Sequence, residues 1–383
     1  MSWPLVQIGR CVEKVRTWNP TGGPECIFQY VDLSSVDKSK KIIDLDDVAE
    51  ISSADAPSRA RQLVVTGDVL VATVRPNLNG VAVVPAELNG ATASTGYCVL
   101  RADEKNLHGR YLFYWVQTDS FVEEMMSKAT GANYPAVSDK IIKESQIPLP
   151  PLPEQKRIAA ILDKADAIRR KRQQAIQLAD DFLRAVFLDM FGDPVSNPKG
   201  WEVKPLGSLV VNKDGKRIPI KASDRADMAG EYPYYGASGV IDYVNDFIFE
   251  GRHLLIGEDG ANLLARSTPI AFIADGRYWV NNHAHVLGEK NSLSLDYLAF
   301  SINMRGLESF VSGSAQPKLN QENLNKIPIQ VPPLILVDKF SAILNGRQEY
   351  MEKMIISEPE VLFSSLSQKA FSGQLFARES PCV

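Results

Sequence analysis

The sequence lacks any long uncharged apolar run. No stretch approaches the ~20 residues of a membrane span. The start, MSWPLVQIGRCVEKV, also has no basic segment followed by an apolar one, as a secretory signal has. We therefore expect no membrane association and a soluble, cytoplasmic protein.

Cysteine is scarce. The four cysteines, Cys11, Cys26, Cys98 and Cys382, show neither C-x-x-C nor Cys/His spacing. This pattern argues against a disulfide framework and against a zinc site. We expect no metal site in the chain.

An excess of basic residues is also missing. The formal net charge is −4, whereas DNA-binding domains usually carry a basic excess. No segment is strongly basic. Any DNA-binding face must therefore be a local patch, with acidic groups turned elsewhere.

Motifs that would indicate catalysis are absent as well. We find no Asn/Asp-Pro-Pro-Tyr/Phe motif for a flipped adenine, no phosphate-binding loop of the G-x-x-x-x-G-K-[ST] type and no dinucleotide-binding glycine pattern. The chain is therefore expected to be a binding protein and not an enzyme.

What the sequence does contain is an internal repeat. The stretch ATGANYPAVSDKIIKESQIPLPPLPEQKRIAAIL from Ala129 aligns with VSGSAQPKLNQENLNKIPIQVPPLILVDKFSAIL from Val311. The shift is a constant 182 residues, from Gly131 to Gly313 and from Pro135 to Pro317. Repeats determine architecture, so we expect two homologous halves that have diverged most in their first parts.

Each half begins with short apolar runs bounded by turn residues, such as 69–71 and 254–256, which are typical of strands. Helical stretches at 112–126 and 295–310 lie among them. We predict an α+β (mixed α/β) fold with globular domains at 1–150 and 191–332, a central helix region at 151–190 and a distal helix region at 333–383.

The central helix is expected to begin at Pro153-Glu154 and to run to about Met190, because its interior has no glycine or proline. The distal helix contains Pro359, which should kink or split it. We predict that the two helices pair antiparallel as a coiled coil, since neither small domain can bury so long an apolar stripe. The predicted seam consists of Ile158, Ile161, Ala165, Ile168, Arg172, Ala175, Ala179, Phe182 and Val186.

The segment IPLPPLPEQKRIAAILDKADAIRRKRQ from Ile147, its second copy at 327–344 and the AFSGQL that starts at Ala370 form a specific pattern. YPYYGASG from Tyr232 and WVNNHAHV from Trp279 add to it. Together they resemble the specificity subunits of type I restriction-modification systems over essentially the whole chain. One departure is that residues 335–339 replace the Pro-Glu-Gln-Lys-Arg of the first copy.

This resemblance implies two pseudo-repeated target recognition domains that bind double-stranded DNA. It also implies assembly with two methyltransferase subunits and, through the complex, with motor-nuclease subunits. Those partners would bind S-adenosylmethionine, ATP and Mg, and this chain would bind no cofactor. The candidate partner-binding residues lie in the helix regions: Pro151, Leu152, Glu154, Arg157, Pro333 and Phe340.

Candidate DNA contacts lie in the variable regions. Arg75, Asn77 and Asn79 follow a predicted strand, and Arg and Asn can make bidentate contacts to base edges; the alternative is a solvated turn. Tyr134 and Gln316 stand at equivalent points of the repeat, in what are alternatively structural turns. The remaining candidates are Lys213, Arg217, Asn281, Asn282 and His283.

Two other functions stay open at this stage. The chain could be a coiled-coil adaptor that joins two proteins without DNA, or a methyltransferase or nuclease that acts alone. The divergent domains on a duplicated scaffold favour reading of two DNA half-sites over the adaptor, and the missing cofactor motifs count against the enzymes.

Overall fold

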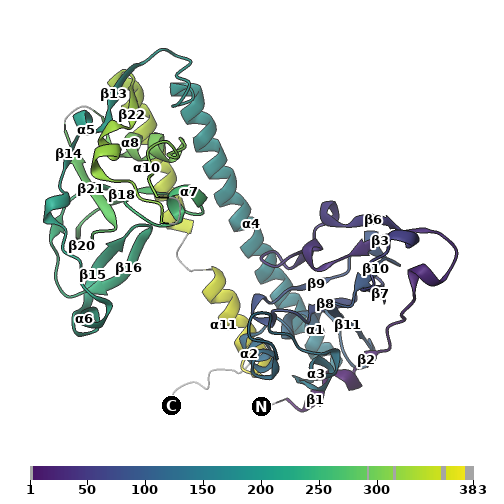
Figure 1. The fold of residues 1–383 in the computed structure, drawn as a ribbon. Helices are drawn as coiled ribbons and strands as arrows, with labels where there is room; N and C mark the ends of the chain where they lie inside the picture. The colour runs from purple at the N-terminus through teal and green to yellow at the C-terminus, as the bar shows by residue number, and fades with distance from the viewer. Residues whose placement is uncertain (1–2, 291–292, 314–315, 355–358, 376–383) are drawn as a thin grey trace, which may run out of the picture. The chain divides into compact units, whose positions relative to one another are not determined.

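The protein forms two compact units, which Figure 1 shows as ribbons. The structure is a computed structural model, and it describes residues 3–290, 293–313, 316–354 and 359–375. Unit 1 comprises residues 1–174 and 357–383, and unit 2 comprises residues 175–356. Unit 1 is therefore built from the two ends of the chain.

Unit 1 contains two four-stranded sheets, with strand orders β6-β3-β10-β7 and β2-β11-β8-β9, and two-stranded ribbons β1-β12 and β4-β5. In the second sheet β8 lies between β11 and β9, and all of its side chains are buried. The strands are β1 Leu5–Gln7, β2 Val12–Glu13, β3 Ile27–Val31, β4 Val36–Asp37, β5 Ile42–Ile43, β6 Ala49–Ser52, β7 Ala60–Leu63, β8 Val69–Ala72, β9 Val81–Val83, β10 Thr92–Ser94, β11 Tyr97–Ala102 and β12 Gln146–Pro148.

Unit 2 repeats this arrangement. Its sheets have the orders β16-β15-β20-β17 and β14-β21-β18-β19, and its ribbon is β13-β22. The strands are β13 Glu202–Pro205, β14 Val210–Asn212, β15 Ala229–Gly236, β16 Gly239–Val244, β17 Phe249–Glu250, β18 His253–Gly257, β19 Ala271–Ala274, β20 Arg277–Val280, β21 Ala284–Glu289 and β22 Pro328–Val331.

The two strand orders correspond one to one along the chain. β1 to β3 match β13 to β15, and β6 to β12 match β16 to β22. In the first sheet of each unit, the second and third strands run parallel: β3 with β10 in unit 1, and β15 with β20 in unit 2. Among the described residues, only the β4-β5 hairpin has no counterpart in unit 2. The predicted internal repeat is confirmed and extends through regions where the two halves differ in sequence.

Short helices connect the strands. The helical stretch predicted at 112–126 is two helices, because Thr118 accepts a hydrogen bond from the N–H of Phe121 and starts a second one. The stretch predicted at 295–310 ends earlier, at Asn303. The short α-helices are α1 Gly109–Trp115, α2 Asp119–Lys128, α3 Asp139–Glu144, α5 Leu206–Leu209, α6 Ala222–Asp227, α7 Asn262–Ala265, α8 Leu295–Asn303 and α9 Gln321–Lys326; the 3-10 helices are η1 Ile8–Arg10, η2 Pro20–Gly22, η3 Leu33–Ser35, η4 Leu45–Asp47, η5 Ser53–Asp55, η6 Pro76–Leu78, η7 Ala86–Leu88 and η8 Asp214–Lys216.

The predicted central helix is α4, Leu152–Phe191, an uninterrupted helix of 40 residues. The distal region contains α10, Leu334–Met354, and α11, Pro359–Phe371. Residues 355–358 lie outside the described residues, and so does the predicted kink or split of the distal helix near Pro359.

Each unit pairs part of α4 with one distal helix, and both pairs run antiparallel. In unit 2, Phe187 and Phe191 of α4 pack against Phe340 near the start of α10, while Asp180 pairs with Arg347 further along it. In unit 1, residues 158–162 of α4 share a core with Ala370 and Phe371 at the end of α11. Arg169 of α4 lies over the ring of Phe363, nearer its start.

The predicted seam of α4 needs correction. Ile168 and Phe182 were assigned to the seam, yet they are 67% and 61% exposed. The buried stripe instead follows a four-residue spacing, through Leu162 in unit 1 and through Leu183, Phe187 and Phe191 in unit 2. The reason is that α4 packs against the cores of the globular parts as well as against a partner helix, so a strict 3.5-residue period does not apply.

Candidate nucleic-acid interface

In unit 1, a loop closes over the end of β8. Ala136 forms isolated bridges with Thr130 and with Val74, which follows β8. The N–H of Arg75 donates to the carbonyl of Pro135 at 2.7 Å. The Gly-Ala-Asn-Tyr-Pro sequence at 131–135 is therefore anchored against the chain that leaves this strand.

Unit 2 builds the same loop after β18. Lys318 bridges Ser312 and Asp259, and the N–H of Gly260 donates to the carbonyl of Pro317 at 3.1 Å. Arg75 and Gly260 thus occupy equivalent positions. So do Tyr134 and Gln316, as the repeat predicts, and both of these side chains are exposed.

Glycine is required at one point of each loop. Gly131 and Gly313 have φ values of +99° and +83°. A Cβ atom at these positions would lie 2.8 Å from the carbonyl oxygen of Tyr134 and 2.6 Å from that of Gln316. Because of the left-handed backbone and the close carbonyl, any residue larger than glycine would be strained at these positions.

Arg75 projects from the loop in unit 1. Its φ of 50° is left-handed, which is rare for a residue with a Cβ atom. The guanidinium lies 4.5 Å from the ring centroid of Tyr134, which is 66% exposed. Within the part of the chain that the structure describes, no hydrogen bond or ion pair engages the Arg75 side chain. Its donors are held in place by stacking and remain available.

The two asparagines that follow Arg75 differ. Asn77 is exposed in η6. Asn79 is turned inward, and its side-chain NH₂ donates to the carbonyl of Gln117 at 3.1 Å. The Asn79 carbonyl accepts a hydrogen bond from Lys41. Asn79 therefore has a structural role in its turn, whereas Asn77 is accessible.

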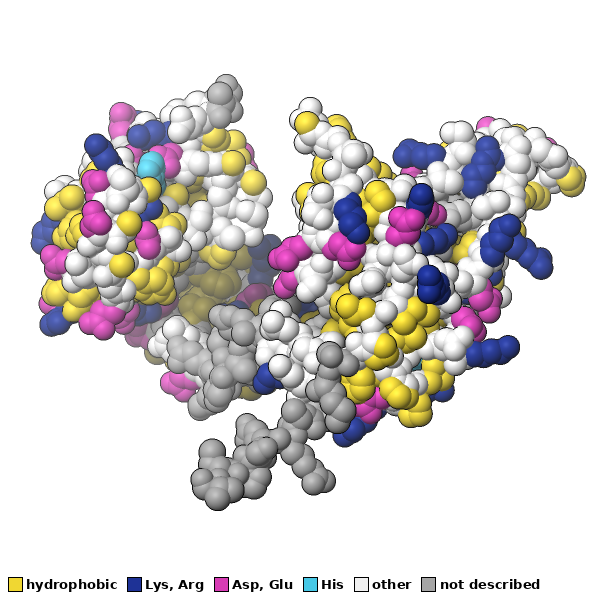
Figure 2. Space-filling view, turned by 90° about the horizontal axis from the view of Figure 1, so that it is seen from below, with side chains coloured by type: hydrophobic (Ala, Val, Ile, Leu, Met, Phe, Trp, Pro, Cys, Tyr) yellow, Lys and Arg dark blue, Asp and Glu magenta, His cyan; other side chains and the backbone are white. Residues whose placement is uncertain are grey.

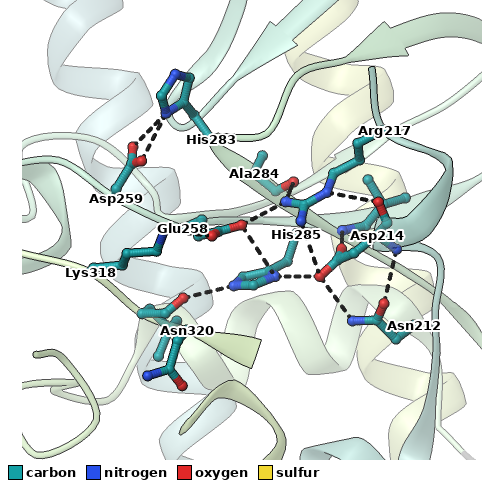
Figure 3. Close-up of polar contacts among 12 residues, drawn as sticks. Asn212, Asp214, Arg217, Glu258, Asp259, His283, Ala284, His285, Lys318 and Asn320 are labelled. Atoms are coloured by element: carbon teal, nitrogen blue, oxygen red, sulfur yellow. Dashed lines mark hydrogen bonds and ion pairs between the residues drawn. The ribbon is translucent and has the colours of Figure 1, made fainter. Parts of the chain in front are cut away.

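Arg217 does not extend toward solvent. Its side chain is 14% exposed and lies 2.7 Å from Glu258 and 2.8 Å from the carbonyl of Ala284 (Figure 3). The Nε–H donates to the carbonyl of Asp214 at 3.1 Å. Arg217 is thus an internal ion-pair residue, which argues against its predicted contact with DNA. Lys213, another predicted contact, places its ammonium 2.7 Å from Nε2 of His253.

A buried histidine completes this network. Nδ1 of His285 lies 2.6 Å from Asp214, and Nε2 lies 2.8 Å from the carbonyl of Leu319 (Figure 3). Burial by itself raises the pKa of Asp214, but the hydrogen bonds from His285 and from the N–H of Val286 outweigh it and lower that pKa below its ordinary value. The network joins η8 and Leu319 to β21.

The cluster after Trp279 is mixed. Asn281 is buried, and its side-chain oxygen accepts from the N–H of His283 at 2.8 Å. Asn282 is exposed, and His283 is half exposed with Nδ1 2.8 Å from Asp259. Across the described ranges, no three His, Cys, Asp or Glu side chains come together as metal ligands.

The predicted partner-binding residues also divide. Pro151, Arg157 and Pro333 are exposed, Leu152 is half-buried, and half-buried Glu154 lies 3.9 Å from Arg157. The prediction for Phe340 is wrong. This side chain is completely buried against Phe187, Phe191 and Phe300, so it belongs to the core of unit 2 and is no surface for another protein.

Sequence reasoning missed the role of Gln155 within the Glu-Gln-Lys-Arg motif. This side chain is completely buried. Its amide donates to the carbonyls of Asn106 and Pro150 at 2.9 and 2.8 Å, and its oxygen accepts from the N–H of His108. Gln155 thereby joins the start of α4 to the Pro-rich turn and to the segment before α1.

Charge is mixed on the surface that Figure 2 shows. Lys and Arg side chains stand among Asp and Glu side chains over both units on that face and form no continuous basic area. The basic run at 169–172 is partly neutralised within unit 1, since Asp166 pairs with both Arg169 and Arg170. No helix in the described ranges is both long and apolar enough to cross a membrane.

Comparison with known proteins decides the family. The model of the family described as "Type I restriction modification DNA specificity domain" matches residues 81–178 and 198–365, which is more than half of the chain. The chain belongs to this family.

Several relatives carry specificity-subunit names. A putative type I restriction enzyme specificity subunit of Haemophilus influenzae is 35% identical over 145 residues, 38% of this chain and 37% of that protein. The type I restriction enzyme MjaIX specificity subunit of Methanocaldococcus jannaschii is 23% identical over 287 residues, 66% of this chain and 64% of that protein. The aligned regions thus span less than two thirds of either relative.

Two solved structures share the fold along nearly the whole chain. The S subunit of a type I restriction-modification system from M. genitalium has a TM-score of 0.62 at 17% identity and covers 97% of this chain and 96% of its own. A second structure is described as showing the structural basis of complex assembly and conformational transition of the type I R-M system. It has a TM-score of 0.56 at 23% identity, with 98% of each chain covered. These likenesses confirm the predicted fold of two similar domains with long helices.

Proposed function

We propose that this chain is the DNA sequence-specificity subunit of a type I restriction-modification complex, and that each unit reads one half of a bipartite site in double-stranded DNA. The chain performs no catalysis in this proposal. Two methyltransferase subunits bind S-adenosylmethionine, and motor-nuclease subunits that join through the complex use ATP and Mg.

The observation that carries the proposal is the duplicated loop at the ends of β8 and β18. The backbone hydrogen bonds that anchor it are alike in the two units, whereas the residues at matching positions differ: Arg75 and Tyr134 in unit 1 correspond to Gly260 and Gln316 in unit 2. A shared backbone with different side chains suits the reading of two different sequences, because specificity comes from side chains that reach base edges.

The helices supply the remaining parts of the proposal. α4 has 40 residues, which at ~1.5 Å per residue gives a rod of about 60 Å that sets the spacer between the half-sites. Exposed apolar side chains on the helices, namely Ile168, Leu178, Phe182, Leu334, Ile335 and Tyr350, give the methyltransferase subunits apolar surface to dock on.

A domain exchange tests the proposal. Residues 191–332 are replaced by the corresponding domain of a relative that reads another sequence, and methylated adenines are mapped in cells that supply the methyltransferase. We expect one half of the methylated motif to change and the other to stay. A change in both halves, or in neither, contradicts the assignment of one half-site to each unit.

The adaptor alternative is tested by a gel shift of the assembled complex. Binding that random duplex competes away as well as the mapped motif does would favour a protein without sequence recognition. Methylation by the purified chain alone would favour a stand-alone enzyme.

A further inference from the structure

A small cavity in unit 1 lies beside Arg75 and Tyr134. Its volume is about 220 Å³. The buried part of its lining is apolar and includes Val36, Ala72 and the ring of Tyr97. Exposed side chains complete the lining, namely Lys38, Arg75, Leu78 and Tyr134. An apolar interior therefore meets a rim that carries two cations.

Two polar groups of the buried lining are already engaged. The hydroxyl of Tyr97 donates to the carbonyl of Asp32 at 3.0 Å. The carbonyl of Gly80 accepts from the N–H of Ala72 at 2.8 Å. A polar group that entered the cavity would lose its hydrogen bonds to water without replacement, which is costly. The lining consequently selects an apolar group.

The rim indicates what carries that apolar group. Lys38 and Arg75 favour a polyanion, and Arg75 extends from the loop assigned to DNA under the proposed function. In the major groove of DNA, thymine alone among the four bases displays an apolar substituent, its C5 methyl group. Relying on the proposed function, we propose that this cavity receives the 5-methyl edge of one thymine in the half-site that unit 1 reads.

The size of the cavity agrees with this occupant. At about 30 Å³ per water molecule, it holds roughly seven waters, which is room for a methyl group and the adjoining ring edge. Water against an apolar lining is poorly hydrogen-bonded, so its displacement by an apolar group favours binding. Removal of one buried methyl group should weaken binding about fourfold.

Among the described residues, unit 2 differs from unit 1 at two positions of this rim. Gly260 and Gln316 stand where unit 1 has Arg75 and Tyr134, so the stacked cation and its aromatic support have no equivalent at those positions. The sensitivity to a thymine methyl should therefore be confined to one half of the site.

The test uses the full chain assembled with its methyltransferase and a duplex that contains the methylated motif mapped in cells. Each thymine of the motif is replaced in turn by deoxyuridine, which removes only the methyl group, and the dissociation constant is measured. Leu78→Phe fills the cavity from its exposed side; Leu78 is 40% exposed, so the fold should tolerate the change. Leu45→Phe, at a leucine of unit 1 that is 46% exposed and outside the lining, is the matched control.

We expect one thymine, in one half-site, whose replacement weakens binding about fourfold in the wild type and in Leu45→Phe but not in Leu78→Phe. The inference is overturned if no thymine behaves in this way, or if Leu78→Phe weakens assembly with the methyltransferase while the methyl effect persists. A complex that binds the motif no better than random DNA would contradict the proposed function itself, and is thereby distinguished from failure of the cavity alone.

Discussion

Arg75 and Gly260 occupy the same position in the two units, and both have a left-handed backbone, with φ of 50° and 103°. Their N–H groups donate to Pro135 and Pro317, the prolines that the repeat pairs. Glycine adopts this conformation without strain, whereas a residue with a Cβ atom is strained there by roughly 1–2 kcal/mol. Arg75 therefore lowers the stability of unit 1, whereas Gly260 causes no such loss in unit 2.

Replacing Arg75 should separate stability from DNA binding. We expect Arg75→Gly to raise the free energy of unfolding by up to about 1 kcal/mol, because the strain is removed while glycine adds some chain entropy. Affinity of the assembled complex for its motif should fall by about tenfold or more, as for loss of a bidentate base contact. Urea denaturation and a binding titration measure the two effects. Arg75→Lys keeps the charge without the planar fork, so near-normal specificity in that variant would count against a bidentate contact.

The paired loop glycines should be about equally sensitive. Gly131→Ala and Gly313→Ala each force a Cβ atom against a carbonyl oxygen in a left-handed turn, and we expect a loss of about 2–3 kcal/mol of unfolding free energy from each. Gly90→Ala is the control, because its φ is also positive but nothing lies within 4 Å of the added atom. There the loss should stay near 1 kcal/mol. Equal losses at all three positions would show that the close carbonyls do not matter.

Arg217 should act on stability and not on DNA. Arg217→Met removes the guanidinium that pairs with Glu258 and Asp214, although Glu258 keeps Lys318 and Asp214 keeps His285. Breaking a buried pair costs about 3–5 kcal/mol when the remaining charge has no other partner, so we expect a smaller loss of about 1–3 kcal/mol of unfolding free energy. The salt dependence of DNA affinity should stay unchanged, because the dependence reports cations that neutralise phosphates. Arg75→Met, at an exposed arginine, should instead lower the affinity for the motif. A reduced salt slope for Arg217→Met would reassign this residue to the interface.

Lys41 should make stability depend on alkaline pH. Burial, reinforced by Arg169, lowers the pKa of Lys41 from 10.5 to about 8. Below pH 8 the amine is charged in both the folded and the unfolded chain, so the full cost of the buried charge is present. Between about pH 8 and 10.5 the folded chain releases the proton first, and stability rises with pH.

The variant Lys41→Met removes this titration. The difference in unfolding free energy between Lys41→Met and the wild type should therefore shrink as the pH rises from 7.5 to 9.5, as measured by urea denaturation. Lys14→Met, at an exposed lysine of the same unit, is the matched control for loss of a lysine. A constant difference for Lys41→Met would contradict the lowered pKa.

Much of the scaffold could be predicted from local sequence. The repeat and the long helix, which was expected to run to about Met190 and ends at Phe191, depend on glycine, proline and apolar spacing, which act over a few residues. The register of the α4 seam could not be predicted in this way, because Ile168 and Phe182 fit a 3.5-residue period as well as buried residues do. Which apolar face is covered depends on the globular cores that the helix meets.

The contacts of the polar candidate residues could not be predicted from local sequence either. In the sequence Arg217 cannot be told from other basic loop residues, because its contact with Glu258 depends on the tertiary fold. The contact between His285 and Asp214 likewise joins residues that are 71 positions apart. Tyr134 and Gln316 were paired correctly, since the repeat itself encodes their equivalence. The resemblance of the distal helix region implied a partner surface at Phe340, whereas the aromatic cluster that buries this residue comes from α4 and α8.

Because unit 1 is built from both ends of the chain, its core is completed late in biosynthesis. Its core includes Ala370 and Phe371, and the ring of Phe371 lies 5.0 Å from that of Tyr111. A ribosome makes Tyr111 early and Phe371 after every residue of unit 2. The unit that is started first is therefore completed last, and the face of α1 at Tyr111 and Trp115, which Phe371 contacts, lacks that contact while unit 2 acquires all of its own core. Folding during translation, at about 5–20 residues per second, leaves that face open to chaperones or to early pairing with another chain for the time it takes to synthesise roughly two hundred residues.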